Sequence, residues 1–253
     1  MRKLLPVLLF FIISCFLVSI ASAQQSNKLT KKEKKEGWKL LFNGKNLKGW
    51  HSYHHKGVTK DWKVQNGAII ANVKNNGGKS DLETDKQYSN FDLKLEWKMK
   101  ACSNSGIMFH VNDSPKYKES YFTGPEMQIA SGSCKWTFNH KTINDAQIHL
   151  HRAGDLYDLV PVDTEWVKPA GKWNKFEIRA DNAHLKLFEN GHKVVDTKMY
   201  GNHWRRLISR SKFSQWPDFG TFRKGHITFQ GTEKGKIWFR DIKIKIFKFG
   251  PTS

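Results

Sequence analysis

The sequence predicts an all-β fold, an antiparallel two-sheet sandwich or jelly roll in one domain. Apolar and polar residues alternate along many short segments, and turn signals separate these segments. In NFDLKLEWKM, for example, Phe91, Leu93, Leu95, Trp97 and Met99 share one face of a strand. No amphipathic helical pattern longer than two turns and no internal repeat is found in the sequence.

Further strands are expected where the same alternation recurs. The segments that show it are GIMFHV, YFTGPEMQIA, KFEIRA, HLKLFENGHKVV, GHITFQG and GKIWFRDIKIKIF. Asn66-Gly67 and Asn190-Gly191 predict tight hairpin turns, because both central residues of such turns need positive φ. Residues 134–167 and 201–223 are long irregular stretches, and long loops on a rigid β scaffold often carry function.

The chain begins with the pattern of a secretory signal peptide, residues 1–23, which ends in the small residues of ASA. We therefore expect export to the periplasm or the extracellular space after cleavage near Ala23. The alternative is a lipoprotein attached through Cys15, but the apolar run continues past that cysteine. Residues 24–37 form a charged segment expected to be flexible, and residues 38–249 form the domain. No later segment approaches the roughly 20 apolar residues of a membrane span.

The chain has a net charge of +20, and removing Arg2 and Lys3 with the signal leaves 20 − 2 = +18. This charge suggests an anionic partner such as an acidic polysaccharide or a membrane surface, although a solvated lysine-rich surface is the more common explanation of such a charge. No sequence signature of nucleic-acid binding is present. Cys102 and Cys134 remain after cleavage, either as a single disulfide or as two free thiols. The oligomeric state is left open.

Alternation also predicts a polar face shared by several strands. The residues that point away from the apolar side are Glu96, Met108, His110, Glu126, Gln128, Gln230 and Arg240. Carboxylates, amides, histidine and arginine bind sugar hydroxyls or move protons. The alternative is that these are separate surface residues on unrelated strands.

The irregular stretches contribute further candidates. Tyr157 follows Asp155 and precedes Asp158, either of which could bind a divalent cation through oxygen. Trp204 could stack on a sugar ring or pack beneath its loop, and Arg205 beside it could contact an anionic group. The spacing of His51, His54 and His55 also allows metal binding, although solvated loop histidines are more common. The cofactor is therefore open, with a divalent cation as one candidate.

Several segments in order resemble the 3-keto-disaccharide hydrolase family. They are GWKLLFNGKNLKGW, DWKVQNGAI, YSNFDLKLEWKMKACSNSGIMFHV, GPEMQIA, AGDLYDLV, KPAGKWNKFEIRADNAHLKLFENGHKVVD and GHITFQGTEKGKIWFRDIKIK. The resemblance spans residues 38–247 and implies a jelly roll of the concanavalin A-like lectin/glucanase type with a concave face for carbohydrate. It also matches Asn104, Glu126, Gln128 and Arg240 to motif positions of the family.

The resemblance implies cleavage of 3-keto-glycosides through base-assisted removal of a proton. Glu126 is then the central acid/base or metal-binding carboxylate, with His110 and Glu96 as further catalytic candidates. Expected substrate contacts are Gln128, Asn104, Arg240, Tyr157, Trp204 and Arg205. Two features depart from the family: His110 stands where members commonly carry arginine, and Ala130-Ser131 replaces the usual aspartate after the glutamine strand.

Two other function classes remain. The first is a glycan-binding module without catalysis, because this type of fold serves lectins as well as hydrolases. The second is an ordinary endo-glycanase, which needs two carboxylates about 5–10 Å apart across the scissile bond. Glu96 and Glu126 could form such a pair.

Overall fold

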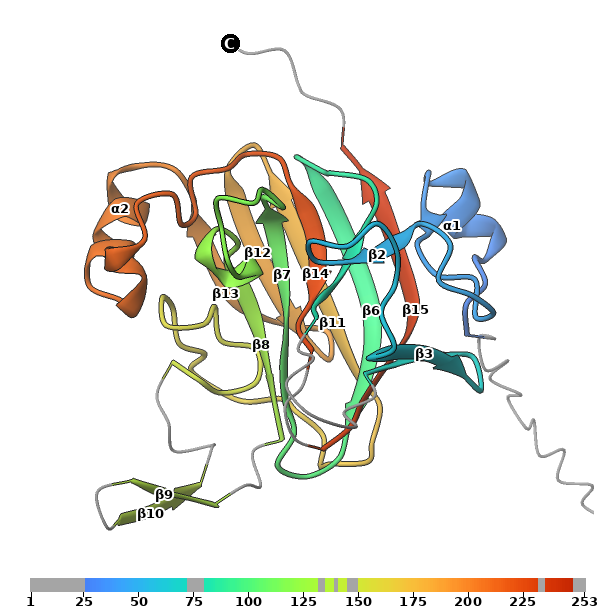
Figure 1. Cartoon of the computed structure of the whole chain (residues 1–253), viewed down its shortest axis with the longest axis horizontal. Helices are drawn as coiled ribbons and strands as arrows, with labels where there is room; N and C mark the ends of the chain where they lie inside the picture. Colours follow the sequence, from blue (N-terminus) through green and yellow to red (C-terminus); the bar gives the residue numbers. More distant parts are fainter. Residues whose placement is uncertain are drawn as a thin grey trace, which may run out of the picture.

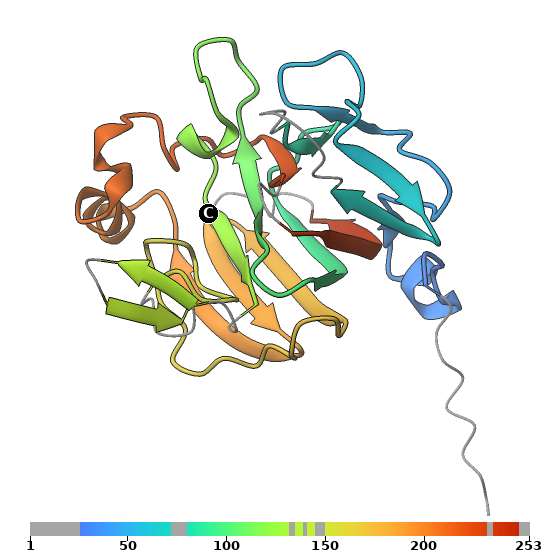
Figure 2. The same cartoon turned by 60° about the horizontal axis from the view of Figure 1, so that its bottom comes forward.

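Two antiparallel β-sheets dominate the structure, a computed structural model that describes residues 26–71, 80–131, 135–138, 141–144, 150–231 and 235–247 (Figure 1). The two sheets lie face to face, and the few helices stand at the periphery (Figure 2). The all-β, two-sheet jelly-roll prediction is confirmed.

The larger sheet has eight strands in the order β13-β12-β11-β6-β15-β4-β3, and β1 also pairs with β15. Their bounds are β1 Lys39–Leu40, β3 Trp62–Gln65, β4 Ala68–Ala71, β6 Phe91–Met99, β11 Asn174–Asp181, β12 His184–Glu189, β13 His192–Lys198 and β15 Ile237–Ile246. The β3–β4 hairpin turns at Asn66 and Gly67, and the β12–β13 hairpin turns at Asn190 and Gly191. All four residues have positive φ, as predicted.

The smaller sheet has five strands in the order β2-β5-β14-β7-β8. Their bounds are β2 Trp50–Ser52, β5 Leu82–Thr84, β7 Asn104–Val111, β8 Glu126–Ala130 and β14 His226–Phe229. A separate hairpin consists of β9 Lys135–Phe138 and β10 Lys141–Asn144. The short helical elements are α1 Lys31–Lys35, η1 Ser120–Phe122, α2 Asn202–Ser209 and η3 Lys212–Gln215.

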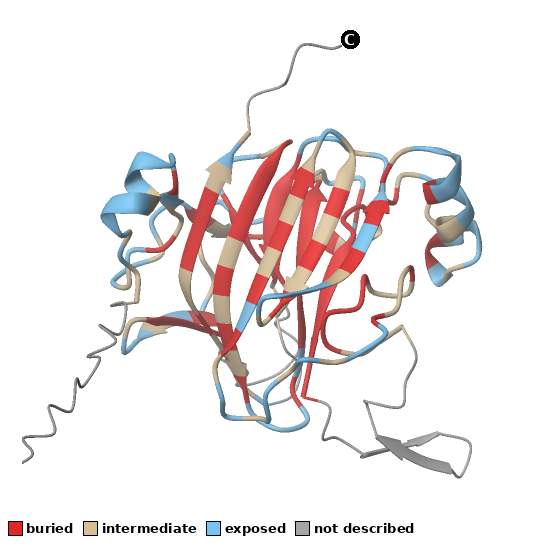
Figure 3. Cartoon of the chain, turned by 180° about the vertical axis from the view of Figure 1, so that it is seen from behind, coloured by how far each residue is buried: buried red, intermediate tan, exposed pale blue. Residues whose placement is uncertain are grey.

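The hydrophobic core fills the space between the sheets. The larger sheet contributes the alternate side chains predicted from β6, of which Phe91, Leu93 and Trp97 are buried. Seen from behind, its strands show buried bands alternating with partly exposed ones (Figure 3). The smaller sheet supplies Met127 and Ile129 to the same core. Glu126 and Gln128 therefore point to the opposite, outer face of that sheet.

The segment before the domain differs from the flexible segment expected there. The Thr30 hydroxyl caps α1 by accepting a hydrogen bond from the backbone N–H of Glu33, and the Glu33 carboxylate accepts one from the backbone N–H of Thr30, which completes a capping box. Glu33 also pairs with Lys243 of β15 at 2.6 Å. Local capping and this ion pair hold the helix against the larger sheet.

The predicted signal peptide, its cleavage site and Cys15 lie outside the described residues, and so does Cys134. Cys102 is disulfide-bonded, so the alternative of two free thiols is wrong for this residue. In the part of the chain that the structure describes, no helix combines the length and apolar character required to cross a membrane. The domain limits at residues 38 and 249 stay a prediction.

Candidate active site

Glu126 opens β8 on the outer face of the smaller sheet. Its strand pairs with β7, where Met108 is opposite Glu126 and Gly106 is opposite Gln128. The Glu126 side chain lies across the backbone of Gly106, because a Cβ atom on this glycine would overlap with the Glu126 carboxylate. The carboxylate of Glu126 therefore occupies space that is free only because Gly106 has no side chain.

A loop from the first irregular stretch covers the free edge of β8. The Gln128 N–H donates to the carbonyl of Asp155 at 3.0 Å, and the Tyr157 N–H donates to the carbonyl of Glu126 at 2.9 Å. The Asp155 carboxylate accepts backbone N–H groups of Arg152 and Val162, each at 2.6 Å. Asp155 thus stabilises the loop, and the loop places Tyr157 beside Glu126.

The second irregular stretch closes the same region from the other side. Lys212, the first residue of η3, donates through Nζ to the Tyr157 hydroxyl at 2.9 Å. Its backbone N–H donates to the carboxylate of Asp158 at 2.8 Å. Asp158, proposed from sequence as a cation ligand, therefore joins the two irregular stretches.

These elements enclose a pocket of about 110 Å³. It is lined by Asn104, Tyr121, Gly124, Glu126, Gln128, Tyr157, Lys212, Phe213 and Gln230. On one side the Gln128 amide donates a hydrogen bond to Asn104 Oδ1 at 2.9 Å. The Asn104 amide in turn donates to Gln230 Oε1 at 3.4 Å. The pocket thus combines a carboxylate, a cation, two phenols and three amides, which are groups that bind hydroxyls and transfer protons.

The Glu126 carboxylate has an unusual environment. Only 5% of the residue is exposed, and Oε1 has no hydrogen-bond partner among the described residues. Burial raises the pKa of Glu126 to about 8, the charge of Asp81 adds to this increase, and Lys212 opposes it. Partial burial lowers the pKa of Lys212. A carboxyl group with such a pKa exchanges protons near neutral pH, as a general acid or base must.

His110 does not share this face, so its expected position is wrong. Two residues of β7, Phe109 and His110, lie opposite the single Ile227 of β14, and His110 has φ of 55°. This bulge turns the ring into the core beside Phe91, where Nε2 donates to the Ser89 carbonyl at 2.9 Å. Burial lowers the pKa of His110 to about 4, so the ring is neutral at pH 7.

Glu96 and Arg240 also lie away from Glu126. They belong to β6 and β15 of the larger sheet, and their side chains point outward from that sheet. Arg240 Nε donates to Glu96 at 2.8 Å, and its guanidinium lies 3.9 Å from the Trp173 ring centre. Glu96 and Glu126 therefore face opposite sides of the sandwich. They cannot flank one glycosidic bond.

Trp204 and Arg205 do not line the pocket either. Trp204 is 1% exposed within α2, and its Nε1 donates to the carbonyl of Gly220 at 2.9 Å. It packs beneath the second irregular stretch and is not available to stack on a sugar. Arg205 is exposed on α2, and its guanidinium donates a hydrogen bond to the side-chain oxygen of Asn202.

Trp204→Ala is expected to lower the free energy of unfolding by about 3–5 kcal/mol, because it leaves a cavity beneath the loop. Trp204→Phe should cost about 1 kcal/mol through the lost hydrogen bond, without changing KM for a glycan. Denaturant melting and steady-state kinetics measure both quantities. Trp166→Phe, at a 43% exposed indole, is the control and should change stability by less than about 0.5 kcal/mol. A raised KM in Trp204→Phe with unchanged stability would contradict this packing role.

A second polar cluster lies on the same outer face, at its other edge. The strand register aligns five residues across the sheet. In order from β2 to β8 they are His51, Glu83, Thr228, Met108 and Glu126. One row of side chains thus crosses the sheet from β2 to β8. His226 lies two residues before Thr228, and His51, Glu83 and His226 bring potential metal-ligating atoms within 4.8 Å of one another.

Sequence reasoning missed several members of both clusters. Lys212 lies in an irregular stretch without periodicity, so nothing local assigned it to the pocket. Glu83 and His226 are different, because alternation with Leu82 and Ile227 could have placed them on the outer face. Neither segment indicates that β5 and β14 are neighbouring strands, so the sequence did not show that Glu83 and His226 lie close together.

The fold and the pocket define a β-sandwich protein with a polar pocket on the outer face of one sheet. The chain belongs to the 3-keto-alpha-glucoside-1,2-lyase-like domain family, whose model matches residues 37–245. The resemblance noted in the sequence is confirmed.

Three relatives illustrate the family. A 3-keto-disaccharide hydrolase of Bacteroides thetaiotaomicron is 27% identical over 234 residues, 83% of this chain and 79% of that protein. A crystal structure from Parabacteroides distasonis, provisionally described as a glycosyl hydrolase, is 31% identical with a TM-score of 0.80, covering 88% of this chain and 100% of the other. A second such structure from that organism is 26% identical with a TM-score of 0.61, covering 83% and 99%.

Proposed function

We propose that the protein is a carbohydrate-acting enzyme that cleaves 3-keto-glycosides in the Glu126 pocket. The observation that carries the proposal is the buried Glu126 carboxylate, whose Oε1 has no hydrogen-bond partner among the described residues and which lies in a pocket with three amides and a lysine. Family membership and the named hydrolase relative support the substrate class.

The chemistry follows from the ketone at C3. This group makes the proton on C2 acidic, because the resulting anion is delocalised as an enolate. Ionised Glu126 removes the C2 proton, and the electrons of the C2–H bond pass into the enolate. They then form the C1=C2 double bond as the glycosidic oxygen leaves C1 with its bonding pair and takes up the proton that Glu126 removed. Water adds across this double bond, its hydroxyl to C1 and its proton to C2, which completes net hydrolysis.

The surrounding residues have separate tasks in this proposal. Lys212 and the Tyr157 hydroxyl lie together at one side of the pocket and would stabilise the enolate oxygen through charge and hydrogen bonding. Gln128, Asn104 and Gln230 would hold the sugar hydroxyls. Because the raised pKa makes Glu126 a stronger base than an ordinary carboxylate, it suits the removal of a carbon-bound proton.

Incubation with a 3-keto-glucoside and with the matching unoxidised glucoside tests the proposal. We expect aglycone release from the 3-keto compound alone, together with deuterium incorporation at C2 in D₂O. Cleavage of both substrates at similar rates would contradict an enolate mechanism. Tight binding of either compound without product would instead identify the glycan-binding module, which the substitution of Ala130-Ser131 for the family aspartate favours.

We also propose that the protein is exported after removal of residues 1–23. The disulfide of Cys102 supports this, since disulfides persist in oxidising compartments. The charge of about +18 favours an anionic carbohydrate or surface at that location.

A further inference from the structure

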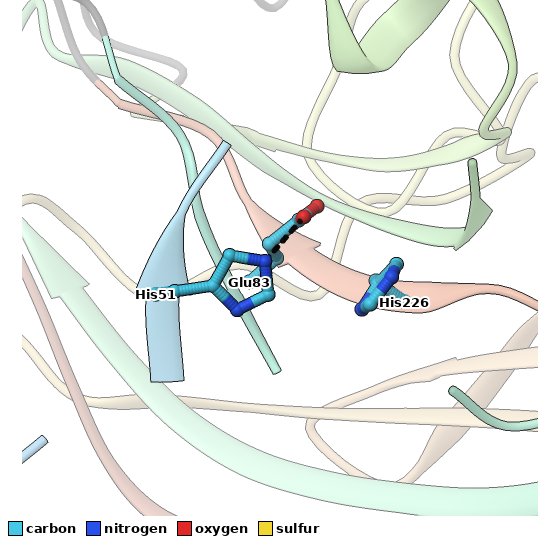
Figure 4. A group of neighbouring side chains, drawn as sticks. All are labelled: His51, Glu83 and His226. Carbon is cyan, nitrogen blue, oxygen red and sulfur yellow. Dashed lines mark ion pairs between the residues drawn. The ribbon is translucent and has the colours of Figure 1, made fainter. Parts of the chain in front are cut away.

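The cluster of His51, Glu83 and His226 has no role in the proposed reaction. Its members come from β2, β5 and β14, three neighbouring strands of the smaller sheet, and their side chains converge on the outer face (Figure 4). Glu83 and Glu126 are separated by three strand spacings in the row, roughly 14 Å. Thr228 and Met108 lie between them, so the cluster is separate from the pocket.

Both histidines have a hydrogen-bond acceptor at Nδ1. His226 Nδ1 lies 2.6 Å from the carbonyl of Thr84, which can only accept, so Nδ1 donates and the lone pair of the neutral ring is on Nε2. His51 Nδ1 lies 2.9 Å from a carboxylate oxygen of Asp85, and donation from Nδ1 to Asp85 leaves Nε2 of His51 able to bind a metal ion. A histidine whose Nδ1–H is bonded to a carboxylate or carbonyl is the usual arrangement of a metal ligand.

Glu83 places a buried carboxylate against Nε2 of His51. The residue is fully buried, and its Oε1 lies 3.0 Å from Nε2 of His51 but receives no hydrogen bond from the described residues. Its other oxygen accepts from the Thr228 hydroxyl at 3.1 Å. A nitrogen lone pair and an ionised oxygen at this distance repel each other unless a proton or a cation lies between them.

A second carboxylate increases the negative charge at this point. Asp113, anchored by the backbone N–H of His54, has Oδ2 3.5 Å from Nε2 of His51. Oxygen atoms of two carboxylates, Glu83 and Asp113, thus face the same imidazole nitrogen, an arrangement that a bound cation would stabilise.

We propose that His51, Glu83 and His226 bind a divalent first-row transition-metal ion such as Zn²⁺, with Asp113 as a fourth ligand. Two imidazoles and two carboxylates favour such an ion over Ca²⁺ or Mg²⁺, which prefer sites made only of oxygen. Bonds of about 2 Å require the ligand atoms to draw together by roughly an ångström. Gln87, whose amide lies 3.0 Å from Nε2 of His226, must turn away.

Calorimetric titration with ZnCl₂ tests this site in the chelator-treated mature chain without an affinity tag. We expect one ion per chain and a higher melting temperature. Glu83→Gln and His226→Ala should each weaken binding by at least about 100-fold, and Asp85→Asn, which alters only the partner of His51, by about 10- to 100-fold. Circular dichroism of each variant establishes that it is folded.

His184→Ala is the matched control, since His184 also pairs with a carboxylate, Asp196, but lies on the larger sheet. This variant should bind Zn²⁺ as the unaltered chain does. The proposal is overturned if the folded protein binds no ion. It is equally overturned if Glu83→Gln, His226→Ala and Asp85→Asn bind with unchanged affinity, which would indicate adventitious binding elsewhere. These outcomes are independent of the glycosidase assay.

Discussion

Glu126→Gln is expected to lower kcat/KM for a 3-keto-glucoside by about 10²–10⁴-fold, the usual contribution of a positioned general base. The substitution preserves the shape and volume of the side chain in a pocket where it is 5% exposed. It removes only the ability to take up a proton. Steady-state kinetics with a chromogenic 3-keto-glucoside measures the effect.

The pH dependence supplies a second measurement on the same residue. Because Glu126 must be ionised to accept the C2 proton, kcat/KM should rise with pH and level off above the pKa of about 8. If Glu126 instead acts as a general acid, the rate should fall through the same pH. An activity profile with no inflection near pH 8 would contradict either role.

The stability of the same variant follows by linkage. The folded protein keeps a proton on Glu126 up to about pH 8, whereas the unfolded chain releases it near the ordinary glutamate pKa of 4.5. The stabilising contribution of this proton is therefore complete below about pH 4.5 and is lost as pH rises to about 8. Glu126→Gln should consequently become more stable than the unaltered chain as pH rises through this window.

Glu36→Gln, at an exposed position of the segment before the domain, is the control and should change neither activity nor pH dependence. If Glu126→Gln retained full activity, Glu126 would have no part in the mechanism. Chemical denaturation at pH 5 and at pH 8.5 separates the stability effect from the catalytic one.

Gly106→Ala is expected to reduce activity about as strongly as Glu126→Gln, although it removes no polar group from the pocket. The new methyl group would occupy the position of the Glu126 carboxylate, which must therefore move. The φ angle of Gly106 is not positive, so the effect is steric and does not arise from backbone strain. Overpacking of this kind costs about 1–3 kcal/mol of stability.

Gly57→Ala is the matched control, since a Cβ atom there meets no atom within 4 Å and its φ is also not positive. That variant should keep its activity and its stability. Kinetics and denaturant melting of both variants decide the question. Full activity in Gly106→Ala would mean that the Glu126 carboxylate need not lie across this glycine during catalysis.

Much of the fold is encoded in local sequence. The apolar alternation of β6 predicts its bounds and its buried face because side chains of a strand alternate regardless of what lies beyond it. Asn66-Gly67 and Asn190-Gly191 predict their hairpins because few residues adopt positive φ at low cost. The same reasoning placed Glu126 and Gln128 on the outer face of β8, where the structure has them.

The structure differs from the predicted site wherever the position of a side chain depends on residues far away in the sequence. Alternation distinguishes core side from outer side, but it does not say which sheet a strand joins, so Glu96 and Arg240 were grouped with Glu126 although they lie across the sandwich. His110 was misplaced because one extra residue in β7 reverses its direction, and that bulge exists only relative to β14.

The sequence by itself determined the strands, the hairpins, the family and the outward direction of Glu126, since each depends on residues close together in the chain. Only the tertiary structure decided which side chains meet. Lys212 and Tyr157 reach Glu126 from two separate loops, and His51, Glu83 and His226 converge from three strands. The tertiary structure also determines the shifted pKa values, because burial and neighbouring charge arise only when distant segments pack around a group.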